Sequence, residues 1–135
     1  MPNNASGPFD VKLSPQTLAE AKADSGLGRM SLNKQFHGEL EATSVGEMLT
    51  AMSSSVQGSG AYVAVERVTG KLGGRSGSFA LHHTGVMNRG VPQLTITVVP
   101  DSGTGELTGI TGKLNIRIEP NGKHFYDFEY ELPTQ

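Results

Sequence analysis

Apolar and polar residues alternate with a period of two along most of this chain after residue 28. In the stretch 29–40, Met30, Leu32 and Phe36 share one parity, and most residues of the other parity are polar. A period of two is typical of a β-strand with one buried face. Similar apolar runs recur as far as Leu132, separated by short connections rich in glycine. Short connections join antiparallel neighbours, so the pattern predicts about eight antiparallel strands.

The predicted strands are 29–40, 46–52, 61–72, 75–87 and 91–99, followed by three further segments that end at Leu132. Glycines recur within and beside these strands, at points where a strand bends or two backbones approach closely. Curved strands are what a closing sheet requires. We therefore predict an all-β fold, a small antiparallel up-and-down barrel, with residues 29–135 forming one domain.

The first 28 residues are predicted to be an N-terminal extension. Within this segment, residues 9–13 alternate and indicate one short strand. Ser14 and Pro15 precede the helix formers "QTLAEAKA", so they supply a helix N-cap and a proline at the first helical position. This pattern predicts a short helix or a structured loop, and both remain open.

Gly73-Gly74 predicts a two-residue hairpin turn, because both positions tolerate positive φ. Leu72 then faces Arg75, and this register sorts the hairpin into two faces. One face carries Tyr62, Ala64, Glu66, Val68, Phe79, Leu81 and His83. The other face, which includes Arg67 and His82, is also substantially apolar. A barrel explains apolar residues on both faces, and the bulkier face is predicted to line the lumen.

Glu66 and His83 would then meet inside the barrel, on adjacent strands. A carboxylate and an imidazole in an apolar lumen can act as general acid and base, or can hold the polar end of a ligand. The alternative is a structural ion pair that fills a small barrel. In the second hairpin, a three-residue turn, Pro120-Asn121-Gly122, aligns Ile116 with Tyr126 and keeps the apolar residues on one face.

Composition narrows the classes of function. A net charge of −2 gives no basic surface for nucleic acid, and no apolar run approaches the length of a membrane helix. Absence of cysteine excludes disulfides and thiolate metal sites, and His82 and His83 point to opposite faces, so no metal site is expected. Neither a signal peptide nor a cofactor motif is present, so we expect a cytoplasmic protein without a cofactor.

Four segments resemble a bacterial family of unknown function that has a small barrel similar to plant allene oxide cyclase. They are "KQFHGELEATSVGEML", "YVAVERVTGKLGGRSGSFALHHTG", "VVPDSGTGELTGITGKLNI" and "GKHFYDFEYEL". This resemblance spans residues 28–133 and implies an up-and-down barrel of unassigned activity. Glu66 and the tyrosines Tyr62, Tyr126 and Tyr130 are chemically analogous to the glutamate and tyrosine in the lumen of allene oxide cyclases.

The favoured hypothesis is a barrel that binds a small apolar or aromatic molecule in its lumen. The alternatives are a cofactor-independent isomerase, cyclase or lyase that uses Glu66, and a filled structural barrel. Apolar residues on both faces predict a homo-oligomer in each case. The candidate catalytic residues are Glu66 and His83, and the candidate ligand-binding residues are Tyr62, Glu66, Phe79, Leu81, His83, Tyr126 and Tyr130.

Overall fold

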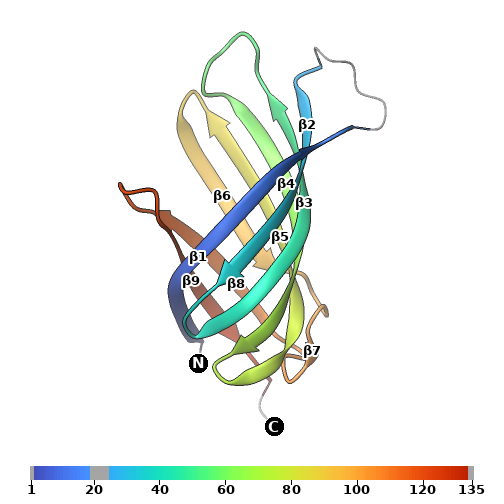
Figure 1. The fold of residues 1–135 in the computed structure, drawn as a ribbon, viewed down its shortest axis with the longest axis vertical. Coiled ribbons are helices and arrows are strands. Elements are labelled where there is room, and N and C mark those ends of the chain that lie inside the picture. The colour runs from blue at the N-terminus through green and yellow to red at the C-terminus, as the bar shows by residue number, and fades with distance from the viewer. Residues whose placement is uncertain (1, 19–24, 134–135) are drawn as a thin grey trace.

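The computed structural model describes residues 2–18 and 25–133, and these residues form strands, turns and loops without a helix. Figure 1 shows a tall barrel of long, tilted strands. The strands are β1 (Asn3–Gln16), β2 (Leu27–Phe36), β3 (Leu40–Met52), β4 (Gly60–Leu72), β5 (Arg75–Asn88), β6 (Val91–Val98), β7 (Thr104–Gly105), β8 (Thr111–Ile118) and β9 (His124–Glu131). The predicted all-β class and antiparallel barrel are confirmed.

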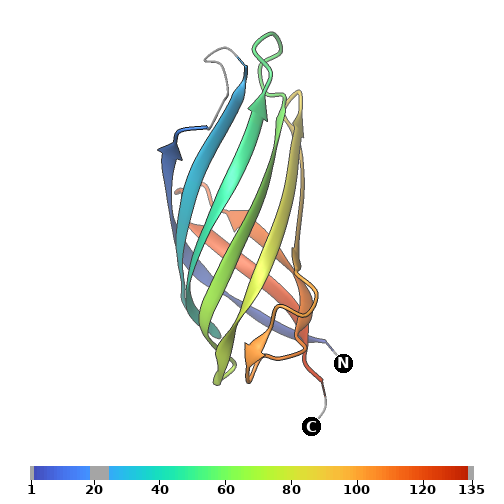
Figure 2. The ribbon, with the colours of Figure 1, turned by 90° about the vertical axis from the view of Figure 1, so that its right-hand side faces the viewer.

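Eight strands form a closed ring in the order β4-β3-β2-β1-β9-β8-β6-β5, and pairing between β4 and β5 completes it. All neighbours are antiparallel, and most are also consecutive in the chain, as an up-and-down barrel requires. The two-residue strand β7 is an addition at the lower end, where it pairs with β5 (Figure 2).

The ring is complete at only one end of the barrel. β1 pairs with β9 no further than Phe9, and β6 pairs with β8 only at Thr97. Beyond those points β1 continues beside β2 alone, and β6 runs beside β5 alone. The β8–β9 hairpin is correspondingly short and ends well below the top of β6 in Figure 1. We call the fully paired end the closed half and the other end the open half.

Large apolar side chains fill the closed half. Phe36, Phe79 and Phe128 are buried there, and the rings of Phe79 and Phe128 stack with their centroids 5.5 Å apart. The segment between β6 and β8 closes the base, because its Leu107 and Ile110 are each only 1% exposed. Burying a side chain of this size contributes about 1.5–3 kcal/mol, so this core supplies much of the stability of the fold.

The N-terminal segment differs from the prediction. The short strand predicted at residues 9–13 is confirmed, but it is part of a longer strand, β1, over residues 3–16. β1 pairs with both β9 and β2, so a barrel strand lies inside the segment expected to be an extension. Ser14 and Pro15 belong to this strand, so the alternative of a helix that begins there is wrong. Residues 17 and 18 follow β1 without regular structure, and residues 19–23 of "QTLAEAKA" lie outside the described residues. Pro15 is tolerated because β1 has lost β9 as a partner at that height, so a missing N–H need not break the ladder.

Both predicted hairpin registers are confirmed. Leu72 pairs with Arg75 and Glu66 with Leu81, around Gly73 and Gly74, whose φ angles of 58° and 84° suit the predicted turn. In the second hairpin Ile116 pairs with Tyr126, and the Glu119 N–H donates to the Lys123 carbonyl across the three-residue turn.

One predicted boundary needs correction. The expected strand 29–40 ends at Phe36, and Leu40 instead begins β3, six residues before the predicted start at Gly46. Two of the three residues between these strands are His37 and Gly38, and Gly38 has a φ of 104°. The apolar residues keep the same parity across this tight turn, so the alternation alone did not indicate that the strand ends there.

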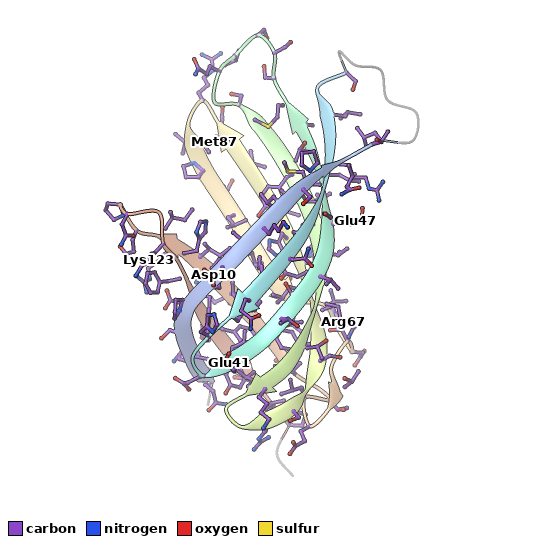
Figure 3. All side chains as sticks on the ribbon, in the orientation of Figure 1. Asp10, Glu41, Glu47, Arg67, Met87 and Lys123 are labelled. Carbon is purple, nitrogen blue, oxygen red and sulfur yellow. The ribbon has the colours of Figure 1, made fainter. Side chains whose placement is uncertain are left out.

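Outward-facing residues complete the barrel wall. Arg67 and Glu47 lie on the outside of β4 and β3, where Figure 3 labels them. The two adjacent charges on β4, in the hairpin that turns at Gly73-Gly74, therefore divide as predicted, with Glu66 buried and its neighbour Arg67 exposed. In the parts of the chain that are described, no helix is long and apolar enough to cross a membrane.

Candidate functional site

A buried polar cluster lies at mid-height in the barrel, where the closed half meets the open half. Its centre is Glu66, whose side chain has no exposed surface. Oε1 of Glu66 accepts a hydrogen bond of 2.8 Å from the Ser44 hydroxyl. Oε2 is 2.9 Å from Nζ of Lys34 and 2.5 Å from Nε2 of His83. We call these four residues the polar cluster.

Lys34 enters the cluster from β2, at a lumen-facing position between Leu32 and Phe36. Its side chain is only 5% exposed. The ammonium group also lies over the rings of Phe9 and Phe36, 5.4 and 5.8 Å from their centroids. Cation–π attraction thus adds to the ion pair with Glu66, and together they compensate for the desolvation of a buried charge.

Tyr62 connects the polar cluster to the open half. Its hydroxyl is 3.3 Å from Nδ1 of His83, whose other nitrogen contacts Glu66. Tyr62 is half-buried, whereas His83 is 3% exposed. A hydrogen-bonded chain therefore runs from the Tyr62 phenol, through the imidazole, to the carboxylate of Glu66.

The two ends of this hydrogen-bonded series, Glu66 and Tyr62, have different protonation states at neutral pH. Burial raises the pKa of Glu66, but the hydrogen bonds from His83 and Lys34, the charge of Lys34 and the charge that His83 carries when protonated together outweigh burial and bring it from 4.5 to about 2. Burial raises the pKa of Tyr62, and the negative charge of Glu66 raises it further. Glu66 is therefore an ionised acceptor at neutral pH, and Tyr62 is a neutral phenol.

Two glycines make room for this arrangement. Gly85 lies opposite Tyr62, and a Cβ added to it would be 2.3 Å from a carbon of the Tyr62 ring, so the ring packs directly over this glycine. Gly46 lies opposite Glu66, and an added Cβ would be 2.7 Å from the Cβ of Glu66. Because Gly46 has no side chain, Glu66 can lie close to β3, and the Ser44 hydroxyl on that strand donates a hydrogen bond to it.

Above the cluster, lumen-facing apolar side chains remain exposed. Leu13, Met52, Met87, Leu94 and Ile118 have lumen-facing parity in their strands, yet they are 46%, 56%, 41%, 39% and 65% exposed. Met30 and Met48 are half-buried on neighbouring positions of β2 and β3. Four of the five methionines thus have lumen-facing positions in the open half. Methionine is flexible and polarisable, and is common at surfaces that adapt to an apolar partner.

The predicted site residues divide between the two halves. Tyr62, Glu66 and His83 come together as predicted. Phe79, Leu81 and Tyr126 share the lumen-facing parity but are 0% exposed, within the closed half. Tyr126 also has a structural role, because its hydroxyl donates to the carbonyl of His37 and accepts from the N–H of Leu40. These bonds fix the turn between β2 and β3.

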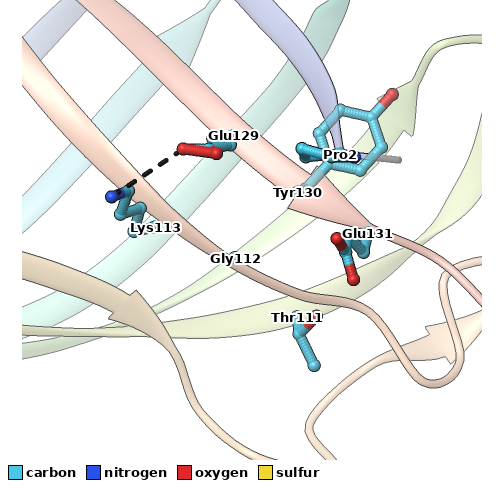
Figure 4. Close-up of a pocket in the computed structure, with 7 residues that line it drawn as sticks. All are labelled: Pro2, Thr111, Gly112, Lys113, Glu129, Tyr130 and Glu131. Carbon is cyan, nitrogen blue, oxygen red and sulfur yellow. Dashed lines mark ion pairs between the residues drawn. The ribbon is translucent and has the colours of Figure 1, made fainter.

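Tyr130 belongs to the core of the closed half, because it is only 8% exposed and its ring stacks on that of Phe128 with the centroids 5.3 Å apart. It also borders a shallow depression near the ends of the described chain. The depression has a volume of about 340 Å³ and is lined by Pro2, Thr111, Gly112, Lys113, Glu129, Tyr130 and Glu131 (Figure 4). Lys113 and Glu129 form a cross-strand pair there at 3.8 Å, and both are largely exposed. Solvated charges and an open shape make this a feature of the outer wall, separate from the polar cluster.

Lys34 and Ser44 were not among the predicted site residues. The signal for Lys34 was available, because its parity matches that of Leu32 and Phe36, and a charge in an apolar series indicates a buried partner. Ser44 fell in a segment that was not assigned to a strand. His82 and His83 point to opposite faces, as predicted, and the described residues hold no grouping of three His, Asp or Glu side chains suited to a metal.

Comparison with known proteins identifies the family. Residues 5–130 match the family described as "Protein of unknown function (DUF3224)". A crystal structure of a DUF3224 protein of unknown function from Shewanella oneidensis MR-1 is 50% identical in sequence, with a TM-score of 0.92 over 99% of this chain and 100% of the other. Among curated proteins, none matches significantly. The chain therefore belongs to the DUF3224 family of β-barrel proteins.

Proposed function

We propose that this protein binds a small, largely apolar molecule in the open half of its barrel, with the polar end of that molecule at Tyr62. One observation carries the proposal. Lumen-facing apolar side chains stay exposed directly above a polar cluster whose buried groups are satisfied by one another. Binding sites of small molecules commonly combine an apolar wall with a few oriented polar groups.

Exposure of the open half favours a ligand over a filled structural barrel. Leu94, Met87 and Leu13 face the lumen but keep 39–46% of their surface in water, whereas residues of the closed half are almost fully buried. Covering an apolar side chain of this size contributes roughly 1–2 kcal/mol when half of its surface is already buried. A molecule that covers several of them, and buries its own apolar surface in the process, gains free energy that offsets the cost of association.

The neutral dye N-phenyl-1-naphthylamine, whose emission rises in apolar surroundings, tests the proposal. We expect saturable binding of one dye per chain. Leu94→Asn should weaken it roughly tenfold, because a polar amide replaces an apolar contact in the open half. Leu49→Asn is the matched control, because Leu49 is 50% exposed on the outer wall and should leave dye affinity unchanged. Equal effects of both variants, or no saturable binding, would refute the proposal.

The chain from Tyr62 to Glu66 favours one further candidate, a cofactor-independent isomerase, cyclase or lyase. Glu66 is fully buried with three partners, so it would act through His83, and Tyr62 would be the group that touches substrate. A molecule recovered from the protein distinguishes the two candidates. Conversion by the native protein but not by Tyr62→Phe would support an enzyme, and release of the molecule unchanged would leave binding alone.

A further inference from the structure

We infer that the molecule bound in the open half is uncharged and carries a hydroxyl group, and that the site discriminates against carboxylates. This inference rests on the proposed binding function and adds the chemistry of the polar end. The hydrogen-bonding directions along Lys34, Glu66, His83 and Tyr62 carry it, because they determine what the Tyr62 hydroxyl has left to offer a ligand.

Glu66 determines which ring nitrogen of His83 carries the proton. Nε2 is 2.5 Å from Oε2 of Glu66, and an ionised carboxylate oxygen can only accept a hydrogen bond. Nε2 therefore carries a proton and donates it to Glu66. A carboxylate that orients a histidine in this way fixes which ring nitrogen remains available on the other side.

The charge of the imidazole depends on Lys34. Lys34 lies 2.9 Å from the same carboxylate and already balances its negative charge. The side chains of Lys34, Glu66 and His83 are 5%, 0% and 3% exposed. A proton on Nδ1 would leave one uncompensated positive charge in this buried cluster, which is costly. His83 is therefore neutral, and its Nδ1 is a bare acceptor.

The state of His83 determines the direction of its hydrogen bond with the Tyr62 hydroxyl. It has one proton, and the bare Nδ1 of His83 is 3.3 Å from its oxygen, so the hydroxyl donates to the imidazole. The phenol oxygen then has only lone pairs to offer a ligand from the open half. A hydroxyl donor satisfies them, whereas a carboxylate brings further lone pairs and a negative charge. The ammonium of Lys34, buried within the polar cluster and paired with Glu66, is not free to compensate that charge.

Three probes of similar length test the head group by displacement of N-phenyl-1-naphthylamine. Octan-1-ol has the donor, and heptyl methyl ether is its isomer without a donor. Octanoate is the anionic counterpart. We expect octan-1-ol to bind about fivefold more tightly than the ether, the equivalent of one neutral hydrogen bond, and octanoate to bind most weakly.

Tyr62→Phe is the matched variant, because it keeps the ring over Gly85 and removes only the hydroxyl. In this variant the preference for octan-1-ol over the ether should disappear, with far-UV circular dichroism unchanged. Equal affinity for alcohol and ether in the native protein, or tighter binding of octanoate, would overturn the head-group inference and leave the binding function standing. Failure of the native protein to bind the dye at all would overturn the binding function and this inference with it.

Discussion

At the scale of single residues, Glu66 organises the polar cluster. Both of its oxygens are occupied, one by Ser44 and the other by Lys34 and His83. It sets the orientation of the imidazole, and the imidazole in turn orients Tyr62. The proposed binding function would therefore depend on a residue that a ligand in the open half does not touch.

Removing the charge of Glu66 should destabilise the protein. Glu66→Gln leaves Lys34 as a buried cation without a counter-ion, and we expect the free energy of unfolding to fall by about 3 kcal/mol. Urea denaturation measures this change. The double variant Glu66→Gln with Lys34→Met removes both charges and should recover most of the loss. Additive effects of the two substitutions would show that the ion pair contributes nothing.

The pH dependence of stability follows from the lowered pKa of Glu66. Its folded-state pKa is about 2 against an ordinary value of 4.5, so acid protonates this carboxylate in the unfolded chain first. The cluster's contribution is complete above about pH 5 and is lost as the pH falls towards 2, a loss of about 3 kcal/mol. Denaturation curves between pH 2 and 6 should show a shallower decline in Glu66→Gln than in the native protein. Parallel declines would contradict the assignment.

At the scale of elements, turn chemistry made the hairpins predictable. Gly73-Gly74 and Pro120-Asn121-Gly122 fix the pairing of the strands beside them, so the meeting of Glu66, His83 and Tyr62 followed from local sequence. β1 was not predictable in this way, because its partner β9 lies more than 100 residues away in the sequence. Ser14 and Pro15 then favoured the start of a helix, and the pairing of these residues with β2 overrode that local signal.

The lack of a short turn also explains why Lys34 and Ser44 were not predicted as part of the site. A long loop joins β3 to β4, so no short turn fixed the alignment of Lys34 and Ser44 with Glu66. Parity gave the lumen-facing side of Phe79 and Tyr126, but it does not give their height in the barrel. These two side chains are buried because they lie in the closed half, where the segment that carries Leu107 and Ile110 covers the base of the barrel. Parity alone does not predict that segment.

A pair of leucines tests the distinction between the halves. Leu107→Ala removes a 1%-exposed side chain from the closed half and should cost about 2–5 kcal/mol of stability. Leu94→Ala removes a side chain that is 39% exposed in the open half, and should cost about 1 kcal/mol or less while weakening dye binding. Thermal denaturation and dye titration measure the two effects. A large loss of stability in Leu94→Ala would mean that the open half is packed core.

At the scale of the whole molecule, the outer wall also carries apolar side chains. Val45, Leu49, Val63, Val65 and Val86 are 49–62% exposed on the outward-facing side of β3, β4 and β5. Monomeric proteins in water rarely expose a contiguous apolar patch that spans several strands. The apolar outer face is therefore the physical basis for expecting a homo-oligomer.

Charge on this wall should change the assembly. We expect the native protein to sediment as an oligomer, and Val65→Lys to shift it towards the monomer, because Val65 lies centrally on β4. Leu13→Lys, a substitution of comparable exposure in the open half, is the control and should leave sedimentation unchanged. A native protein that sediments as a monomer at micromolar concentration would contradict the expectation.

The most direct test of the central claim, a ligand site in the open half, is native mass spectrometry of the purified protein. Denaturation and analysis of any released small molecule would follow. We predict a reproducible bound mass that is retained in Leu49→Asn and reduced in Leu94→Asn, and we expect denaturation to release an uncharged, largely apolar compound that carries a hydroxyl group. Bare protein in every preparation, with no uptake of the neutral dye, would contradict the account and would make the polar cluster a purely structural feature of the barrel.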